Sequence, residues 1–190
     1  MKNKFFLISI CFLFTTANFS QNKKEVDTYL HTLFHILEEK NTEEFYASLY
    51  PKLKEQIPVA QVNSFLGELH SNPNFKTEVK NFKTLAIGNL VTDAENAYAL
   101  VDYVSETHIK FTEEATQKLI AKGTSHFKKL YGERYSYDSD KKLIVTSKDF
   151  KILMVYEDQQ WSHIPGVLKL KPYLNNWVKD EILTRLFAEE

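Results

Sequence analysis

Residues 97–111, AYALVDYVSETHIKF, decide the fold, because they predict one long β-strand with two different faces. Alternate side chains of an extended chain point to opposite sides. One side is mainly apolar and carries Ala97, Ala99, Val101, Tyr103, Ile109 and Phe111. The other side carries Asp102, Glu106 and His108, together with Tyr98 and Leu100. We therefore expect a sheet with one buried face.

Helices are expected on the amino-terminal side of this strand. Residues 23–40 place apolar side chains at helical spacing, which predicts an amphipathic helix with one buried face. Asn41 and Glu44 form a capping pair for a second short helix that runs through Leu53. Pro58 can open a third helix at its first turn, and the sequence SNPN at residues 71–74 ends that helix.

Further strands and two more helical segments complete the pattern. Strands are predicted at residues 77–87, 142–146, 150–156 and 160–164, and the polar turn 157–160 joins the last two. A helical insert at residues 112–132, interrupted at Gly123, separates the early strands from the late ones. Pro172 opens a closing helix. The expected fold class is α+β: amino-terminal helices packed on a curved antiparallel sheet, a helical insert between strands, and a closing carboxy-terminal helix.

The first 20 residues have the pattern of a signal peptide. Lys2 and Lys4 precede an apolar run at residues 5–14, which is shorter than the about 20 residues that cross a bilayer as a helix. We expect cleavage after Ala17, with cleavage after Ser20 as the alternative. Residues 21–190 then form a single cysteine-free domain that is periplasmic or secreted. Lipid attachment at Cys11 is the less favoured alternative, because Ile10 stands where a small residue is wanted.

Charge and motif content argue against several functions. The chain has 24 Lys and Arg against 25 Asp and Glu, and removal of Lys2 and Lys4 leaves 22 against 25, a formal charge of −3. This balance, together with export, argues against a nucleic-acid partner. The nine basic residues within 118–151 are interleaved with aromatic residues, and a solvated lysine-rich surface is favoured over an anion-binding one. The sequence lacks phosphate-loop, nucleophile-elbow and zinc-protease motifs, and we expect no cofactor.

Two sets of residues are candidates for a functional site. Asp102, Glu106 and His108 alternate on one strand face, where an acid beside an imidazole can transfer protons if burial shifts their pKa values. Three aromatic residues, Tyr98, Trp161 and His163, are candidates for lining a ligand pocket. A half-solvated strand face and a packed aromatic core are the simpler explanations of these two sets.

No metal site is predicted. Asp27, His31 and His35 are four residues apart, so they stack along one side of the first helix, as paired metal ligands do. That side lies opposite the apolar stripe, and solvated side chains explain the pattern better.

Three features resemble the nuclear-transport-factor-like superfamily, which includes ketosteroid isomerase and scytalone dehydratase. They are the helical pattern at residues 26–37, the short helices behind it, and the late hairpin ILMVYEDQQWSHI at residues 152–164, with Trp161 just past its turn. The resemblance implies a cone-shaped, cystatin-like α+β domain with a pocket between the concave face of the sheet and the helices. It implies a binding protein or an enzyme, because the superfamily uses this pocket for both.

The leading interpretation is an exported, non-catalytic binding or accessory domain, whose partner is a small apolar ligand, a glycan or an envelope protein. The alternative is a small cofactor-independent isomerase, dehydratase or hydrolase that uses Asp102 with Glu106 or His108. A homodimer formed through the open sheet is a third interpretation.

Overall fold

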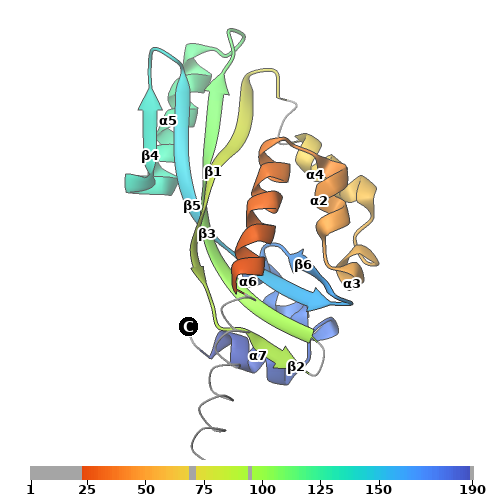
Figure 1. The fold of residues 1–190 in the computed structure, drawn as a ribbon. Coiled ribbons are helices and arrows are strands. Elements are labelled where there is room, and N and C mark those ends of the chain that lie inside the picture. Colours follow the sequence, from red (N-terminus) through yellow and green to blue (C-terminus); the bar gives the residue numbers. More distant parts are fainter. Residues whose placement is uncertain (1–22, 69–71, 94–95, 189–190) are drawn as a thin grey trace, which may run out of the picture.

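The computed structural model describes residues 23–68, 72–93 and 96–188 (Figure 1). The expected signal peptide and Cys11 lie outside the described residues. A helix over residues 23–38 begins the described chain. The remaining elements are α2 (Thr42–Ser48), α3 (Pro51–Lys54), α4 (Val59–Glu68), β1 (Phe75–Ile87), β2 (Val91–Asp93), β3 (Asn96–Phe111), α5 (Gln117–Tyr131), η1 (Gly132–Arg134), β4 (Tyr135–Asp138), β5 (Leu143–Glu157), β6 (Gln160–Ile164), α6 (Val167–Leu170), η2 (Lys171–Asn176) and α7 (Asp180–Phe187).

The six described strands form one antiparallel sheet, which confirms the expected fold class. The strand order is β1-β3-β5-β4, while β2 pairs with β3 and β6 pairs with β5. The central pair is β3 and β5, whose register runs without a break from Ala97 opposite Tyr156 to Lys110 opposite Leu143. Figure 1 shows that these long strands bend, with the N-terminal helix (residues 23–38) on the inner side of the curve.

Both faces of β3 are covered at residues 97–101, although the sequence predicted only one buried face. Ala97, Ala99 and Val101 pack against the N-terminal helix in one apolar cluster. Tyr98 and Leu100, on the opposite face, pack in a second cluster with the carboxy-terminal segments from α6 to α7. This strand is therefore apolar on both sides at residues 97–101, as expected of a strand that is buried on both faces.

The helical insert is one helix and not two. Thr116 caps α5, since its hydroxyl accepts a hydrogen bond from the Leu119 backbone N–H at 3.2 Å. The chain leaves α5 at Gly132, whose φ of 55° places it in the left-handed region that favours glycine. The expected start at residue 112 and the expected interruption at Gly123 are wrong.

Gly123 lies inside α5 because the helix approaches the sheet closely there. A Cβ atom at this position would lie 2.9 Å from the Cζ of Phe111, which is buried under the helix. Gly123 therefore allows the helix to lie close to the sheet, and it does not end the helix. Ile109, Phe111, Ile120 and Ile144 form the apolar cluster between α5 and this end of the sheet.

The late strands differ from the prediction in length. β5 is one strand of 15 residues, where two strands separated at residues 147–149 were expected. β3 pairs with β5 throughout, whereas β4 pairs only as far as Thr146 and β6 only from Leu153. The polar stretch at residues 147–149 therefore lies in the middle of a strand with no described strand on its outer side. The tight turn before β6 is confirmed, with Asp158 and Gln159 both at positive φ.

Two helices are interrupted at positions where one continuous helix was expected. The second helix is split into α2 and α3, because Pro51 opens a new helix and cannot donate a backbone hydrogen bond. The closing helix is divided into η2 and α7, and the backbone of Trp177 bonds to Leu174 with the tighter spacing of a 3₁₀ turn. The apolar residues expected on this helix are nevertheless buried: Leu174, Trp177, Val178, Ile182 and Leu186.

None of the described helices has both the length and the apolar character that a membrane-crossing helix requires.

Candidate ligand-binding site

A cavity of about 330 Å³ lies between the N-terminal helix and the concave face of the sheet. Its walls come from the N-terminal helix, from α2, and from strands β1, β3 and β5. Most of the lining side chains are apolar, and Lys40 is the one charged side chain among the lining residues that the structure describes. The volume falls at the lower end of the range of about 300–1,000 Å³ that is usual for small-molecule pockets.

Four aromatic rings form one wall of this cavity. Phe34 of the N-terminal helix stacks on Phe82 of β1, with the ring centroids 5.0 Å apart and the planes 13° from parallel. Tyr103 of β3 stacks on Phe150 of β5 at 5.3 Å and also contacts Phe34 at 5.4 Å. Burial raises the pKa of Tyr103 to about 12, so its hydroxyl stays protonated at ordinary pH. This wall offers flat, uncharged surfaces to a ligand.

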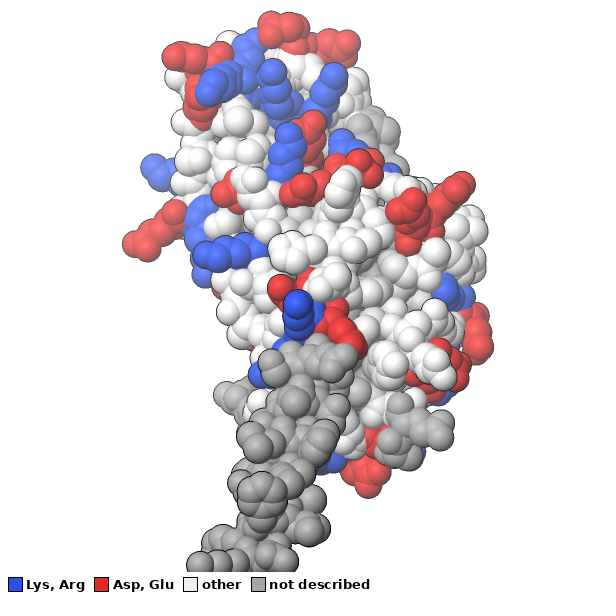
Figure 2. Space-filling model, viewed as in Figure 1, with Lys and Arg blue, Asp and Glu red and all other residues white. Residues whose placement is uncertain are grey.

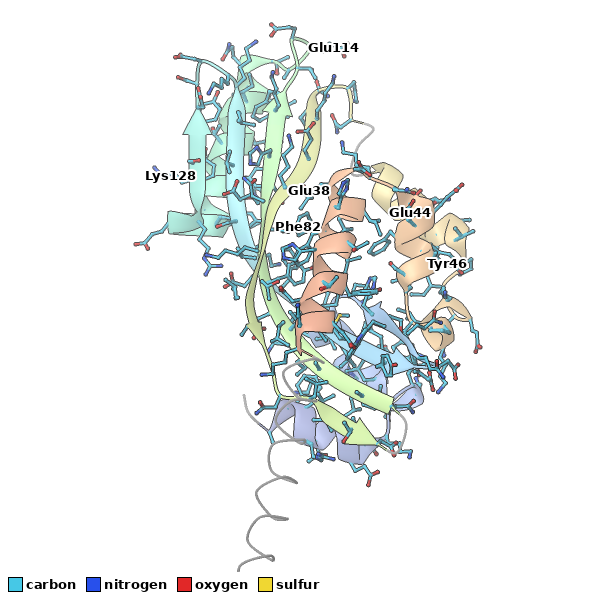
Figure 3. The ribbon with its side chains drawn as sticks, in the orientation of Figure 1. Glu38, Glu44, Tyr46, Phe82, Glu114 and Lys128 are labelled. Carbon is cyan, nitrogen blue, oxygen red and sulfur yellow. The ribbon has the colours of Figure 1, made fainter. Side chains whose placement is uncertain are left out.

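A bulge in β1 places Phe82 in the aromatic wall. Val79 lines the cavity, so strict alternation along β1 would bring residue 81 to the same face. The register shifts between Lys80 and Lys83, with Asn81 at a φ of 53°, and Phe82 takes the inward position (Figure 3).

Asn81 is held at this bulge by contacts to two elements. Its backbone N–H donates to Glu38 Oε1 of the N-terminal helix at 3.0 Å, and its side-chain amide donates to Glu106 Oε2 of β3 at 2.7 Å. These bonds fix the bulge relative to both the helix and the neighbouring strand. The bulge therefore couples the position of Phe82 to the end of the N-terminal helix.

The rim of the cavity is the sharp corner between the N-terminal helix and α2. Lys40 has a φ of 58°, and the backbone N–H groups of Lys40 and Asn41 bond to the carbonyls of Leu37 and Ile36, which closes the helix in a Schellman motif. Asn41 then caps α2 through a bond from the Glu44 N–H, as the sequence predicted. One short segment therefore ends one helix, starts the next and borders the cavity.

His163 lines the buried end of the cavity and has no solvent exposure. Its Nδ1 lies 3.0 Å from the Tyr29 hydroxyl, which donates its own proton to the Ser48 carbonyl oxygen at 2.9 Å. The ring of Phe45 lies beside it, with the centroids 5.5 Å apart. The other ring nitrogen, Nε2, is buried and has no hydrogen-bond partner among the described residues.

His163 is neutral over the whole physiological pH range. Burial lowers its pKa from 6.5 to about 3, and the nearby Ser48 backbone carbonyl opposes this shift only partly. A base with so low a pKa takes up protons poorly near pH 7. This histidine is therefore suited to hydrogen bonding with a ligand and poorly suited to general acid–base catalysis.

The residues predicted for acid–base chemistry lie away from this cavity, since neither Asp102 nor the pair Glu106 and His108 lines it. The Asp102 side chain is 44% exposed and lies 3.4 Å from Lys151 Nζ, on the opposite face of β3. The carboxylate of Glu106 accepts a hydrogen bond from His108 Nε2 at 2.9 Å, and this bond lowers the pKa of Glu106, with a smaller contribution from Asn81. Four strand residues span about 13 Å, so Asp102 is separated from the pair.

The three residues predicted to line a pocket have different surroundings, and only His163 lines the cavity. Tyr98 is buried in the cluster on the opposite face of the sheet. Trp161 packs against Tyr156 at 5.2 Å, and its indole N–H points to Glu25 Oε2 at 3.5 Å. Most of the lining residues, including the aromatic wall, were not among the predicted site residues. One feature of the sequence indicates this lining: the small polar residues Ser105 and Thr107 follow Tyr103 on a strand face that is otherwise apolar.

Elsewhere, several titratable side chains lie beside one another in pairs. His31 lies 3.8 Å from Asp27 and His35 lies 3.3 Å from Glu39, all on the exposed side of the N-terminal helix. No cluster of three or more His, Cys, Asp or Glu residues placed to hold a metal ion is found in the described part of the chain.

The basic stretch at residues 118–151 lies at the end of the molecule that contains α5 and β4. Figure 2 shows basic and acidic side chains interspersed there. Arg134 pairs with Asp149 at 2.7 Å, and Lys142 pairs with Glu113 at 2.9 Å. The positive charge of this stretch is therefore partly balanced by neighbouring carboxylates.

No protein-family model matches the sequence, and the search of curated proteins finds no similar chain. The cavity and the residues that line it are therefore the features that bear on function.

Proposed function

We propose that this protein binds a small apolar ligand in the cavity between the N-terminal helix and the concave face of the sheet, and that it acts as a non-catalytic binding or accessory domain. The observation that carries this proposal is the cavity itself, about 330 Å³ in volume and walled mainly by apolar and aromatic side chains. Apolar pockets with a few placed polar groups are the usual form of ligand sites.

Three further features support binding over catalysis. The histidine at the buried end stays neutral, because burial lowers its pKa to about 3. The described lining residues include no carboxylate, and the one charged side chain among them, Lys40, lies at the rim. The Glu106–His108 pair lies outside the cavity, and its side chains are 36% and 23% exposed. The position of the cavity agrees with the pocket that the nuclear-transport-factor-like resemblance implies, and we propose membership in that superfamily on this ground.

The binding proposal is tested with the neutral fluorescent probe N-phenyl-1-naphthylamine. We expect its emission to rise and shift to the blue on addition of the protein, with saturation at one probe per chain, because the aromatic wall excludes water from the probe. Binding should also raise the melting temperature by mass action.

A matched pair of variants locates the probe. Val79→Trp fills the cavity from β1, whereas Lys76→Trp adds the same side chain at an exposed position of the same strand. The first change should weaken binding at least tenfold, and the second should leave binding unchanged. Equal binding by both variants would place the probe elsewhere, and no binding by the wild type would end the proposal.

A further inference from the structure

We infer that the cavity selects neutral ligands that place one hydrogen-bond donor, a hydroxyl or an N–H group, at the buried end against Nε2 of His163. This inference rests on the proposed function and specifies the chemical class of the ligand. It depends on which ring nitrogen carries the proton, on the burial of the other nitrogen, and on the lack of charge nearby.

The surroundings of Nδ1 fix the tautomer of His163. The Tyr29 hydroxyl has a single proton and donates it to the Ser48 carbonyl at 2.9 Å. The Nδ1 atom lies 3.0 Å from the same oxygen, and both contacts are hydrogen bonds at once only when Nδ1 carries a proton and donates it to Tyr29. A neutral imidazole carries only one N–H, so Nε2 is left with a lone pair and acts only as an acceptor.

A buried acceptor without a partner favours a ligand that donates to it. Nε2 is buried and has no hydrogen-bond partner among the described residues, while His163 as a whole lines the cavity. A buried polar atom that stays unpaired is destabilising, whereas a donor placed against it removes that penalty. A ligand with a hydroxyl at the correct end is therefore held more tightly than the same molecule without that hydroxyl.

Charge at the buried end works against other ligand classes. A carboxylate offers only acceptor oxygens, which would face the acceptor Nε2. A cation would lie among apolar side chains, with no carboxylate among the described lining residues to balance it. The buried end therefore discriminates by donor capacity and by neutrality together.

The test compares three probes of similar shape by isothermal titration calorimetry at pH 7: naphthalene, 2-naphthol and 2-naphthoate. Wild-type protein should bind 2-naphthol about ten times more tightly than naphthalene, and 2-naphthoate more weakly than either. Naphthalene is the more apolar of the first two, so hydrophobic transfer alone would give the opposite order. A preference for the naphthol therefore reports the hydrogen bond.

His163→Asn is the decisive variant. The Asn amide can still donate toward Tyr29 but places no acceptor at the position of Nε2. The preference for 2-naphthol should disappear in this variant, while naphthalene still binds. His31→Asn is the matched control, because the His31 side chain is 79% exposed on the N-terminal helix, and this variant should keep the wild-type preference.

A second measurement does not depend on the folding of any variant at position 163. Nitrogen-15 NMR of the histidine rings distinguishes the two neutral tautomers directly, and His163 should show a protonated Nδ1 and an unprotonated Nε2 at pH 7. Equal binding of naphthalene and 2-naphthol, or a proton on Nε2, would overturn the inference and leave the binding proposal intact. Failure of all three probes to bind the wild type would overturn both.

Discussion

At the scale of single residues, His163 is distinguished by a hydrogen-bonded nitrogen on one side and an unpaired nitrogen on the other. Tyr29 lies on the N-terminal helix, Ser48 ends α2 and His163 lies on β6, so the contacts among them join three elements around the buried end of the cavity. The backbone contributes as well, since the Tyr50 N–H donates to the His163 carbonyl at 2.9 Å. His163 is therefore held in place both through its backbone carbonyl and through its imidazole ring.

The low pKa of His163 makes the stability of the protein depend on pH. In the unfolded chain this histidine takes up a proton near pH 6.5, whereas in the folded protein it does so only near pH 3. Above pH 6.5 both states are neutral, and as the pH falls below 6.5 only the unfolded state gains the proton, so stability is lost. At about 1.4 kcal/mol per pH unit, the wild type should lose roughly 2–3 kcal/mol from this group between pH 7.5 and pH 4.5.

Urea unfolding at these two pH values measures that loss. His163→Asn is expected to be less stable at pH 7.5, but it lacks the titrating group and should decline less on acidification. The difference between the two declines isolates the contribution of His163, because the other titrating groups are shared. Parallel declines in the wild type and the variant would contradict the buried, neutral state of this histidine.

At the scale of elements, Gly123 shows how a contact with the sheet reverses the usual effect of a glycine in a helix. Replacement of an exposed helical glycine by alanine normally stabilises a protein by about 1 kcal/mol. In α5 the added methyl group would lie 2.9 Å from the ring of Phe111, which is 5% exposed and packed in its cluster. We expect Gly123→Ala to destabilise the protein by about 1–3 kcal/mol, as overpacking does.

A smaller side chain at position 111 tests whether the contact with the Phe111 ring causes this loss of stability. In a Phe111→Leu background, Gly123→Ala should cost less than it does in the wild type, because the atom that meets the methyl group is gone. Ser125→Ala, at an exposed position of the same helix, should be neutral or slightly stabilising in thermal unfolding. A stabilising effect of Gly123→Ala in the wild type would contradict the close approach.

The bulge at Asn81 leads to a prediction about backbone strain. Asn81 has a φ of 53°, a region that Gly adopts freely and that β-branched residues strongly disfavour. Both Asn81→Gly and Asn81→Val lose the side-chain bond to Glu106, so the strain alone should make Asn81→Val less stable than Asn81→Gly by about 1–2 kcal/mol. Lys83→Val is the control, because it adds the same side chain to an exposed position of β1 without positive φ.

Chemical unfolding and probe binding report different aspects of this bulge. If Asn81→Val also displaces Phe82, binding of N-phenyl-1-naphthylamine should weaken, while Lys83→Val leaves it unchanged. Equal stability of the Gly and Val variants would show that the strand does not need the left-handed conformation at this position.

The sequence predicted the elements better than their boundaries, for physical reasons that individual residues show. Periodicity identified the N-terminal helix and β3, because long amphipathic patterns report burial directly. The prediction that a helix ends at Gly123 was wrong, because a glycine needed for close packing looks the same in sequence as one needed for a turn. Periodicity divided β5 at its polar middle, because the continuous pairing with β3 is a tertiary feature. The resemblance implied a pocket between the sheet and the helices, but the residues of its aromatic wall were not predicted, since Phe34, Phe82 and Phe150 come from three distant segments.

At the scale of the whole molecule, the sheet connects two unequal packed regions. The larger one includes the N-terminal helix, the carboxy-terminal segments and the first half of β3. The smaller one is the cluster of Ile109, Phe111, Ile120 and Ile144 beneath α5. Between them, residues 147–152 of β5 have β3 on one side and no described strand on the other.

This narrow middle of the sheet has a consequence for amide hydrogen exchange. The end of the molecule that contains α5 and β4 can open without breaking the larger region, so its amides should exchange through a partial unfolding of lower free energy. Amides of β3 at residues 97–102 should exchange only when the whole protein unfolds. Exchange measured in rising urea should divide the amides into two groups, one for each region. Ile120→Ala should lower the free energy of opening only for the group at the α5 end. A single common group of amides would mean that the two regions unfold together. The cavity adjoins the narrow middle through Tyr103 and Phe150, so a bound ligand should slow exchange in both groups.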